Sequence, residues 1–198
     1  MNILVIGESC IDEFVYGEAL RLAPEAPAPV FVPHRKTYNP GMASNVAENL
    51  RSLGAKVEQI TNGNKILKTR YIDDKTNHLL LRIDIGDSET VQMKHITKTH
   101  SSLEDYDAVV ISDYCKGLVS EDDILSICSM HQNVFIDTKK RINECFSEAR
   151  LLKINDREYD NSVDYFQRNQ ELEDKTIVTM GSKGCRLGER VFPVSEVE

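Results

Sequence analysis

The sequence predicts an α/β protein, in which helices cover both faces of a mostly parallel sheet and a smaller β-sheet lies beside it. Short apolar runs rich in β-branched residues recur along the 198 residues, and segments with helical spacing separate them. Apolar strands that alternate with helices are typical of a parallel sheet buried on both faces. Two stretches, 14–33 and 69–85, break the alternation and predict the second sheet.

Five apolar runs are predicted to be strands of the parallel sheet: 3–7, 108–112, 134–137, 151–155 and 176–181. Sheets of this kind bind their ligands beyond the carboxyl ends of the strands. We therefore expect the functional residues directly after these runs.

Two of the intervening helices can be placed from their apolar spacing. The first has a stripe at i, i+4 and i+7 made of Val46, Ala47, Leu50 and Leu53. Gly54 is predicted to end it. Ser120 precedes three acidic residues and is predicted to begin the second helix. The apolar face of that helix would contain Ile124, Leu125, Ile127 and Cys128.

The second sheet is predicted from its prolines and its alternation. Segment 14–33 contains four prolines, which confine it to edge strands or extended loop. Segment 69–85 has the pattern of a hairpin with its turn at 73–77, and places Leu79, Leu81 and Ile83 on one face. We expect both segments to project from the main sheet of a single domain, residues 1–198.

The bulk composition excludes several classes of function. A net charge of -8 and a pI near 5.2 argue against a nucleic-acid-binding surface. No run reaches the roughly eighteen apolar residues that a membrane span needs. The five cysteines are scattered without paired spacing, which predicts reduced thiols in a cytoplasmic protein.

Three short motifs could form a site. In segment 39–47, a glycine turn at Gly41 opens a helix, so a ligand could approach the backbone, and Asn45 could bond a hydroxyl. An ordinary loop-to-helix junction is the alternative. Asn155 and Glu158 are three residues apart and share a helix face, although a helix N-cap explains them as well. Segment 179–184 has a glycine at each end of a turn, which is also typical of a plain β-turn.

Taken in order along the chain, these motifs resemble the ribokinase (PfkB) family of carbohydrate kinases. Pro40-Gly41, Ala43 and Asn45 are similar to the first signature of that family, and Asp12 matches its strand-end aspartate. Segments 24–30, 68–70, 81–84 and 111–117 resemble the heptose-phosphate kinase branch in particular, and Asp137-Thr138-Lys139 resembles its Asp-Pro-Lys motif.

The resemblance implies a shortened ribokinase-like (Rossmann-like) sheet with a small β lid, and ATP and Mg²⁺ as cosubstrates of a heptose phosphate. By this resemblance, the sugar would be bound by Asp12, Gly41 and Asn45. The guanidinium groups of Arg70 and Arg82 would bind its phosphate. The nucleotide side would be formed by Lys139, Asn155, Glu158, Thr179, Gly181 and Gly184, with Glu158 reaching the metal ion through water.

In related kinases the lids of two subunits often clasp each other, so the resemblance also implies a homodimer through the lid. Its interface would contain Leu79, Leu81, Phe31 and Val32. The alternative is that the lid folds down on its own subunit and covers apolar surface there.

The sequence departs from the family pattern at two places. Met42 stands where the family has a second glycine, and its side chain is expected to narrow the sugar site. The sequence ends before the Gly-Ala-Gly-Asp turn that supplies the catalytic base and the anion hole, and Asp113 is only a weak replacement. We therefore expect a catalytically impaired sugar-phosphate-binding relative, a pseudokinase. The alternatives are an active kinase, completed by a second polypeptide or using an unusual base, and a purely structural partner.

Overall fold

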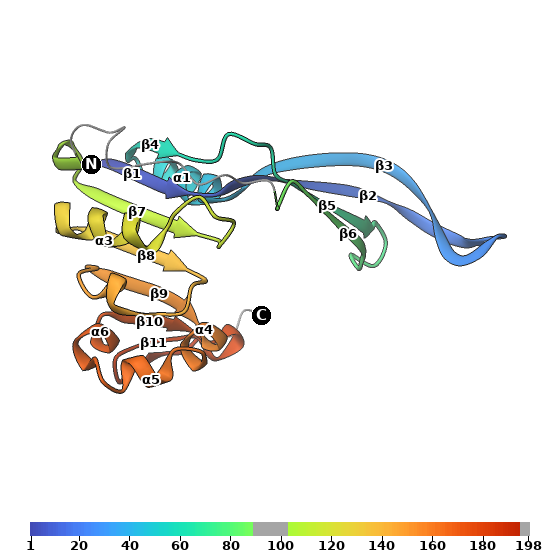
Figure 1. Ribbon diagram of the computed structural model, residues 1–198. Helices are drawn as coiled ribbons and strands as arrows, with labels where there is room; N and C mark the ends of the chain where they lie inside the picture. Colours follow the sequence, from blue (N-terminus) through green and yellow to red (C-terminus); the bar gives the residue numbers. More distant parts are fainter. Residues whose placement is uncertain (89–102, 195–198) are drawn as a thin grey trace.

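The computed structural model describes residues 1–88 and 103–194, which form one large and one small β-sheet (Figure 1). The large sheet has eight strands in the order β12-β11-β10-β9-β8-β7-β1-β4. Its strands are β1 Asn2–Gly7, β4 Lys56–Ile60, β7 Ala108–Asp113, β8 Val134–Thr138, β9 Leu151–Asn155, β10 Thr176–Thr179, β11 Cys185–Leu187 and β12 Arg190–Phe192.

The five predicted strands are all present and are parallel to one another. Neighbouring strands from β4 through β10 pair in parallel, whereas β11 and β12 add an antiparallel edge. The predicted fold class is therefore confirmed. Strands β4, β11 and β12 are additions that the apolar runs did not predict.

Helices cover the sheet from two sides. They are α1 Ala43–Ser52, α3 Glu121–Met130, α4 Asp156–Asp160, α5 Val163–Phe166 and α6 Gln170–Asp174, with short 3-10 turns η1 Leu103–Asp105, η2 Glu144–Phe146 and η3 Gly181–Lys183. Successive side chains of β1 point to opposite faces of the large sheet and belong to two separate core clusters. Leu4 and Ile6 belong to the large cluster that includes residues of α3 and α6, while Ile3 and Val5 pack with α1 on the other face.

The helix starting at Ser120 is as predicted. The Ser120 hydroxyl accepts a hydrogen bond from the N–H of Asp123, and the Asp123 carboxylate accepts from the N–H of Ser120, which completes a capping box. Leu125 does not belong to the buried face, since it is 47% exposed.

The first predicted helix is ended by Gly54 as expected, since Gly54 follows the C-cap Leu53 with a φ of 87°, but its apolar stripe needs one correction. Helix α1 ends at Ser52, and Leu53 is 85% exposed. Its buried residues are Ala43, which lies before the predicted stripe, and Ala47, which belongs to it. The apolar stripe therefore stops at Leu50, because the chain leaves the helix before it completes another turn.

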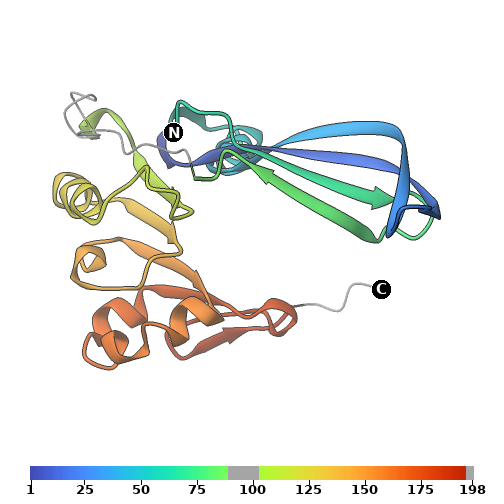
Figure 2. The same cartoon turned by 45° about the vertical axis from the view of Figure 1, so that its right-hand side comes forward.

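The small sheet is the lid, which we define as β2 Ser9–Ala23, β3 Ala26–Met42, β5 Leu67–Asp73 and β6 Leu79–Ile85, in the order β3-β2-β5-β6. Figures 1 and 2 show it projecting from the end of the large sheet, with the β2–β3 hairpin reaching beyond β5 and β6. The lid strands extend beyond the predicted segments 14–33 and 69–85. Three of the four prolines lie on β3, an edge strand, where a missing N–H is tolerated.

The two faces of the lid differ in character. Cross-strand partners share a face, so Asp12, Lys68 and Asp84 lie on one side. Leu81 and Ile83 lie on the opposite side and are 54% and 39% exposed. The lid thus presents a charged face and a second face, here called the apolar face. The exposed Leu81 and Ile83 share this second face with Thr69 and Glu13. Within the described residues, no helix is long and apolar enough to cross a membrane.

Candidate functional site

The site lies where the strand order of the large sheet reverses. From β1 the chain leads first to β4 on one side and later to β7 on the other. The carboxyl ends of β1 and β7 therefore lie at a topological switch point, which is where open α/β sheets bind ligands. The lid starts at this same point, because β2 follows β1 after a single residue, Glu8.

Glu8 builds the floor of the site. Its side chain is fully buried, and its carboxyl oxygens accept hydrogen bonds from the backbone N–H groups of Tyr114, Lys116 and Leu118 at 2.8, 3.0 and 3.0 Å. One side chain after β1 thus fixes the whole loop after β7. Gly7 permits the close approach of the two strands, since a Cβ there would overlap the Ser112 carbonyl.

A cavity of about 400 Å³ opens between this loop and the charged face of the lid. Residues from the start of β2, the end of β3, the strands β5 and β6, and the loops after β6, β7 and β8 form its wall. They are Cys10, Asp12, Met42, Lys68, Arg70, Arg82, Asp84, Asp87, Tyr114, Lys116 and Lys139. The cavity therefore brings together Asp12, Arg70, Arg82 and Lys139 of the predicted site residues.

Ion pairs organise the cavity wall. Arg70 pairs with Asp12, and the Arg82 guanidinium donates to both oxygens of Asp84 at 2.7 and 2.8 Å. The Asp87 carboxylate joins two ammonium groups, that of Lys68 at 3.1 Å and that of Lys116 at 2.6 Å. These pairs hold the cations in place before any ligand arrives.

The wall carries more positive than negative charge. Its five cations, Lys68, Arg70, Arg82, Lys116 and Lys139, face three carboxylates, those of Asp12, Asp84 and Asp87, which leaves an excess of two positive charges. The whole chain has a net charge of -8, so this excess is local. Among the described residues, Lys139 has an aromatic partner, with its ammonium 4.6 Å from the Tyr114 ring centroid, and no carboxylate pairs with it. The cavity is suited to an anion.

The ionisation of these groups follows from their partners. The hydrogen bond from Arg82 lowers the pKa of Asp84. Burial raises the pKa of Asp87, but the hydrogen bonds from Lys116 and Lys68 outweigh this, so that its pKa is lowered overall. Burial, assisted by the charge of Asp12, raises the pKa of Cys10 to about 11, so this thiol is protonated at neutral pH. Asp84 and Asp87 are therefore charged at neutral pH, and the Cys10 thiol is neutral.

The two other predicted sugar residues lie beside the cavity. A Cβ on Gly41 would overlap the Asp12 carboxylate and the Cys10 sulfur, so only glycine lets β3 pass this close to them. Asn45 is exposed on the first turn of α1 and does not line the cavity.

The predicted nucleotide residues other than Lys139 lie at the carboxyl ends of β9 and β10, outside the cavity. Asn155 and Glu158 form a capping box at the start of α4, through hydrogen bonds of 2.9 and 2.7 Å, which is the alternative that the sequence left open. Thr179 donates to the carbonyl of Ile154 at 3.3 Å. Gly181 and Gly184 have φ values of 58° and 91°, typical of a glycine turn.

Asp113 lies in surroundings that do not suit a catalytic base. Its carboxylate is fully buried and accepts hydrogen bonds from Thr138 Oγ1 at 2.7 Å, Lys140 Nζ at 2.6 Å and the Cys115 N–H at 3.0 Å. These bonds tie the loop after β7 to the end of β8 and leave no approach for a substrate hydroxyl. Lys140 is its ionic partner, rather than the Lys116 that the sequence places nearby.

Sequence reasoning did not name Glu8, Lys68, Lys116 and Asp87 as site residues. Glu8 and Lys116 fall in stretches that directly follow predicted strands, which was the available signal. Asp87 follows β6 by two residues, and nothing in the sequence indicates that it joins lysines from two other segments.

Comparisons with known proteins agree with the fold and with the motifs. No protein-family model matches the chain. Bifunctional protein HldE of Caulobacter sp. (strain K31) is 30% identical over 79% of this chain and 39% of the relative. HldE of Shewanella amazonensis is 29% identical over 94% of this chain and 48% of the relative. The chain thus spans less than half the length of these curated relatives.

Solved structures show the same fold at low sequence identity. Phosphofructokinase-2 from Escherichia coli, in complex with potassium, superposes with a TM-score of 0.64 at 14% identity, over 97% of this chain and 77% of that one. Arabidopsis thaliana ribokinase, complexed with ribose and ATP, superposes with a TM-score of 0.61 at 12% identity, over 98% and 77%. The resemblance predicted from the motifs is confirmed: the chain is a sequence relative of the bifunctional HldE proteins and has the ribokinase-like fold.

Proposed function

We propose that the chain binds a sugar phosphate, specifically a heptose phosphate, in the cavity between the lid and the ends of β1 and β7. The observation that carries this proposal is the local excess of positive charge in an acidic protein. The motif resemblance to the heptose-phosphate kinase branch supports the choice of sugar.

The two parts of such a ligand have different partners. Asp12 accepts from Arg70 through Oδ1, which leaves Oδ2 for a sugar hydroxyl. Arg82 uses Nε and Nη2 for Asp84, so its Nη1 is the nitrogen that pairs with no carboxylate in the described part of the chain. Arg70 uses Nη1 for Asp12, and its other N–H groups are donors for the phosphate. The ammonium of Lys139 is exposed and lies at the end of β8, where a phosphate can reach it.

ATP would bind along the ends of β9 and β10, where Asn155, Thr179 and the turn from Gly181 to Gly184 lie. Mg²⁺ commonly binds through substrate phosphates and water, with few protein ligands. The described residues contain no cluster of three or more His, Cys, Asp or Glu side chains that could hold a metal ion. By the motif resemblance, Glu158 would act on the ion through water.

Phosphate transfer by the isolated 198-residue polypeptide should be at most a trace. The sequence contains no Gly-x-Gly-Asp, and Asp113 is buried. A missing base and a missing anion hole each reduce the rate by about two or more orders of magnitude. In an ADP-release assay with ATP and a heptose 7-phosphate, turnover of about one per second or faster, abolished by Asp12→Ala, would refute the impairment.

Binding can be tested separately by thermal unfolding. A ligand that binds only the folded state raises its stability by RT ln(1 + [L]/Kd). We expect a heptose 7-phosphate to raise the melting temperature more than ATP does, and more than the unphosphorylated heptose. If ATP raises the melting temperature more than the heptose 7-phosphate does, the nucleotide side, rather than the lid cavity, is the functional half.

A second candidate is an active kinase completed by another polypeptide, and one observation favours it. In the described residues, α1 covers the sheet face at β1, β4 and β7. Phe135, Leu151 and Ile177 lie on the same face further along the sheet and are only half-buried. A segment packed there would cover them. Co-expression with a separate polypeptide that carries Gly-Ala-Gly-Asp should then restore phosphate transfer, and its failure to do so would remove this candidate.

A further inference from the structure

Met42 occupies a backbone conformation that side chains avoid. It is the last residue of β3 and the N-cap of α1, with φ 57° and ψ -131°. This combination is essentially restricted to glycine, and bulky residues that adopt it are strained. Asn77 also has a positive φ, but asparagine in a hairpin turn tolerates it well.

The surroundings of Met42 enforce this conformation. Its backbone pairs with Ser9 on β2, and the N–H of the next residue, Ala43, donates to the carbonyl of Glu8 at 2.9 Å. On the other side, Gly41 is pressed against Asp12 and Cys10. The strain is therefore held in place by the same contacts that build the site.

The side chain of Met42 forms an apolar part of the cavity wall. It is 7% exposed and packs with Cys10, Ile66 and Tyr114. Met42, Cys10 and Tyr114 line the same cavity as the five cations. The cavity of about 400 Å³ is at the small end of the range for ligand sites, about 300 to 1,000 Å³, so a thioether side chain occupies a substantial share of the space that glycine would leave.

We infer that Met42 is a specificity-determining residue that limits the size of the sugar phosphate in the cavity. This inference rests on the proposed function. A glycine at this position would relieve the strain and enlarge the cavity, yet the chain keeps a large, flexible side chain there. Its thioether presents no hydrogen-bonding group of note to the ligand, so it acts by occupying volume and by disfavouring hydroxyl groups on that side.

The test compares Met42→Gly, Met42→Ala and Met42→Leu. Alanine removes the thioether but keeps the Cβ and hence the backbone strain, whereas leucine keeps most of the bulk. Circular dichroism melts establish that each variant is folded. Calorimetric titration then gives the dissociation constants of a heptose 7-phosphate and an octose 8-phosphate, which carry the same charged group on sugars of different size.

We expect Met42→Gly and Met42→Ala to shift the ratio of the two dissociation constants about tenfold or more in favour of the octose phosphate, and Met42→Leu to keep the wild-type ratio. An unchanged ratio in both small variants, with wild type binding either sugar phosphate, overturns the role of Met42 and leaves the proposed function standing. A shift in Met42→Gly alone would assign the effect to backbone strain and also overturns the size inference. If neither wild type nor any variant binds a sugar phosphate, the proposed function fails and the inference fails with it.

Discussion

Glu8 holds the floor of the cavity, and replacing it by glutamine changes a single carboxyl oxygen into an amide nitrogen. One carboxyl oxygen of Glu8 serves the N–H groups of Lys116 and Leu118, and the other serves that of Tyr114. The amide nitrogen cannot accept a hydrogen bond. In either orientation of the new side chain, at least one buried N–H therefore loses its acceptor.

The expected cost follows from that lost partner. A buried donor left without an acceptor costs about 1–3 kcal/mol. For a chain of this size, each kcal/mol lowers the melting temperature by about 2–4 °C, so we expect Glu8→Gln to melt about 2–12 °C lower than wild type. Sugar-phosphate binding should weaken as well, since Tyr114 and Lys116 line the cavity.

Thermal unfolding followed by circular dichroism measures the change, with Glu48→Gln as the control. The side chain of Glu48 is 57% exposed on α1 and pairs with Arg51 at 3.6 Å, so its replacement should change the stability by no more than about 0.5 kcal/mol. A Glu8→Gln melting temperature equal to that of Glu48→Gln would refute the role given to the three backbone hydrogen bonds.

Two further predictions concern alkaline stability and assembly. Burial raises the pKa of Cys10 and Cys128 to about 11 and that of Cys145 to about 12, from an ordinary value of 9.0, so the folded state holds these protons more tightly than the unfolded chain. The stability that the protonated thiols contribute is complete below pH 9 and should be lost as the pH rises through 11 to 12. Denaturant unfolding between pH 8 and pH 12 measures this loss. If the variant with all three cysteines replaced by alanine shows the same dependence of unfolding free energy on pH as the wild type, the prediction is wrong. We also expect the protein to form a homodimer through the apolar face of the lid. Leu81→Asp should dissociate this dimer, as measured by light scattering, whereas Leu53→Asp, at an exposed position after α1, should not. A wild-type protein that is a monomer at tens of micromolar would contradict the prediction.

The sequence predicted the elements whose signals are local. The strand runs could be placed because each is a short apolar segment between polar ones, and Ser120 could be placed because a capping box is contained in four residues. Helical spacing alone does not show where a helix ends. Leu53 fits the spacing of the apolar stripe, but it lies after the last residue of α1.

The site was predicted less completely because its contacts are long-range. Glu8 and Tyr114 are 106 positions apart, and Lys116 and Asp87 are 29 apart. No local pattern indicates such pairs. Asp12, Arg70, Arg82 and Lys139 were named because the resemblance supplied an expected role for each. The structure places all four around one cavity, and their roles stay predictions.

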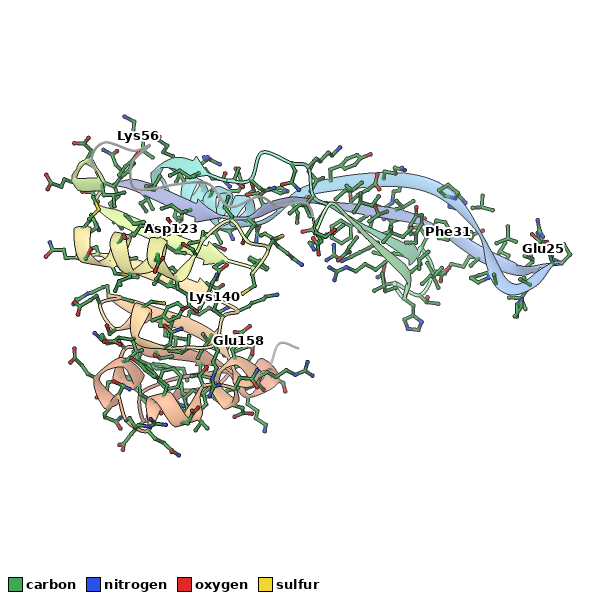
Figure 3. All side chains as sticks on the ribbon, viewed as in Figure 1. Glu25, Phe31, Lys56, Asp123, Lys140 and Glu158 are labelled. Carbon is green, nitrogen blue, oxygen red and sulfur yellow. The ribbon has the colours of Figure 1, made fainter. Side chains whose placement is uncertain are left out.

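The central proposal is that the charged cavity recognises the phosphate of a sugar phosphate, and a single calorimetric comparison tests it most directly. Lys139→Met removes the cavity ammonium that has no carboxylate partner among the described residues, while Lys56→Met removes an exposed ammonium at the opposite end of the sheet, at the start of β4 (Figure 3). Wild type and Lys56→Met should bind a heptose 7-phosphate equally and the unphosphorylated heptose much more weakly. Lys139→Met should bind the phosphate about tenfold or more weakly, the loss expected for one hydrogen bond to a charged group. Equal affinity of all three proteins for the phosphorylated and unphosphorylated sugars would contradict the proposal.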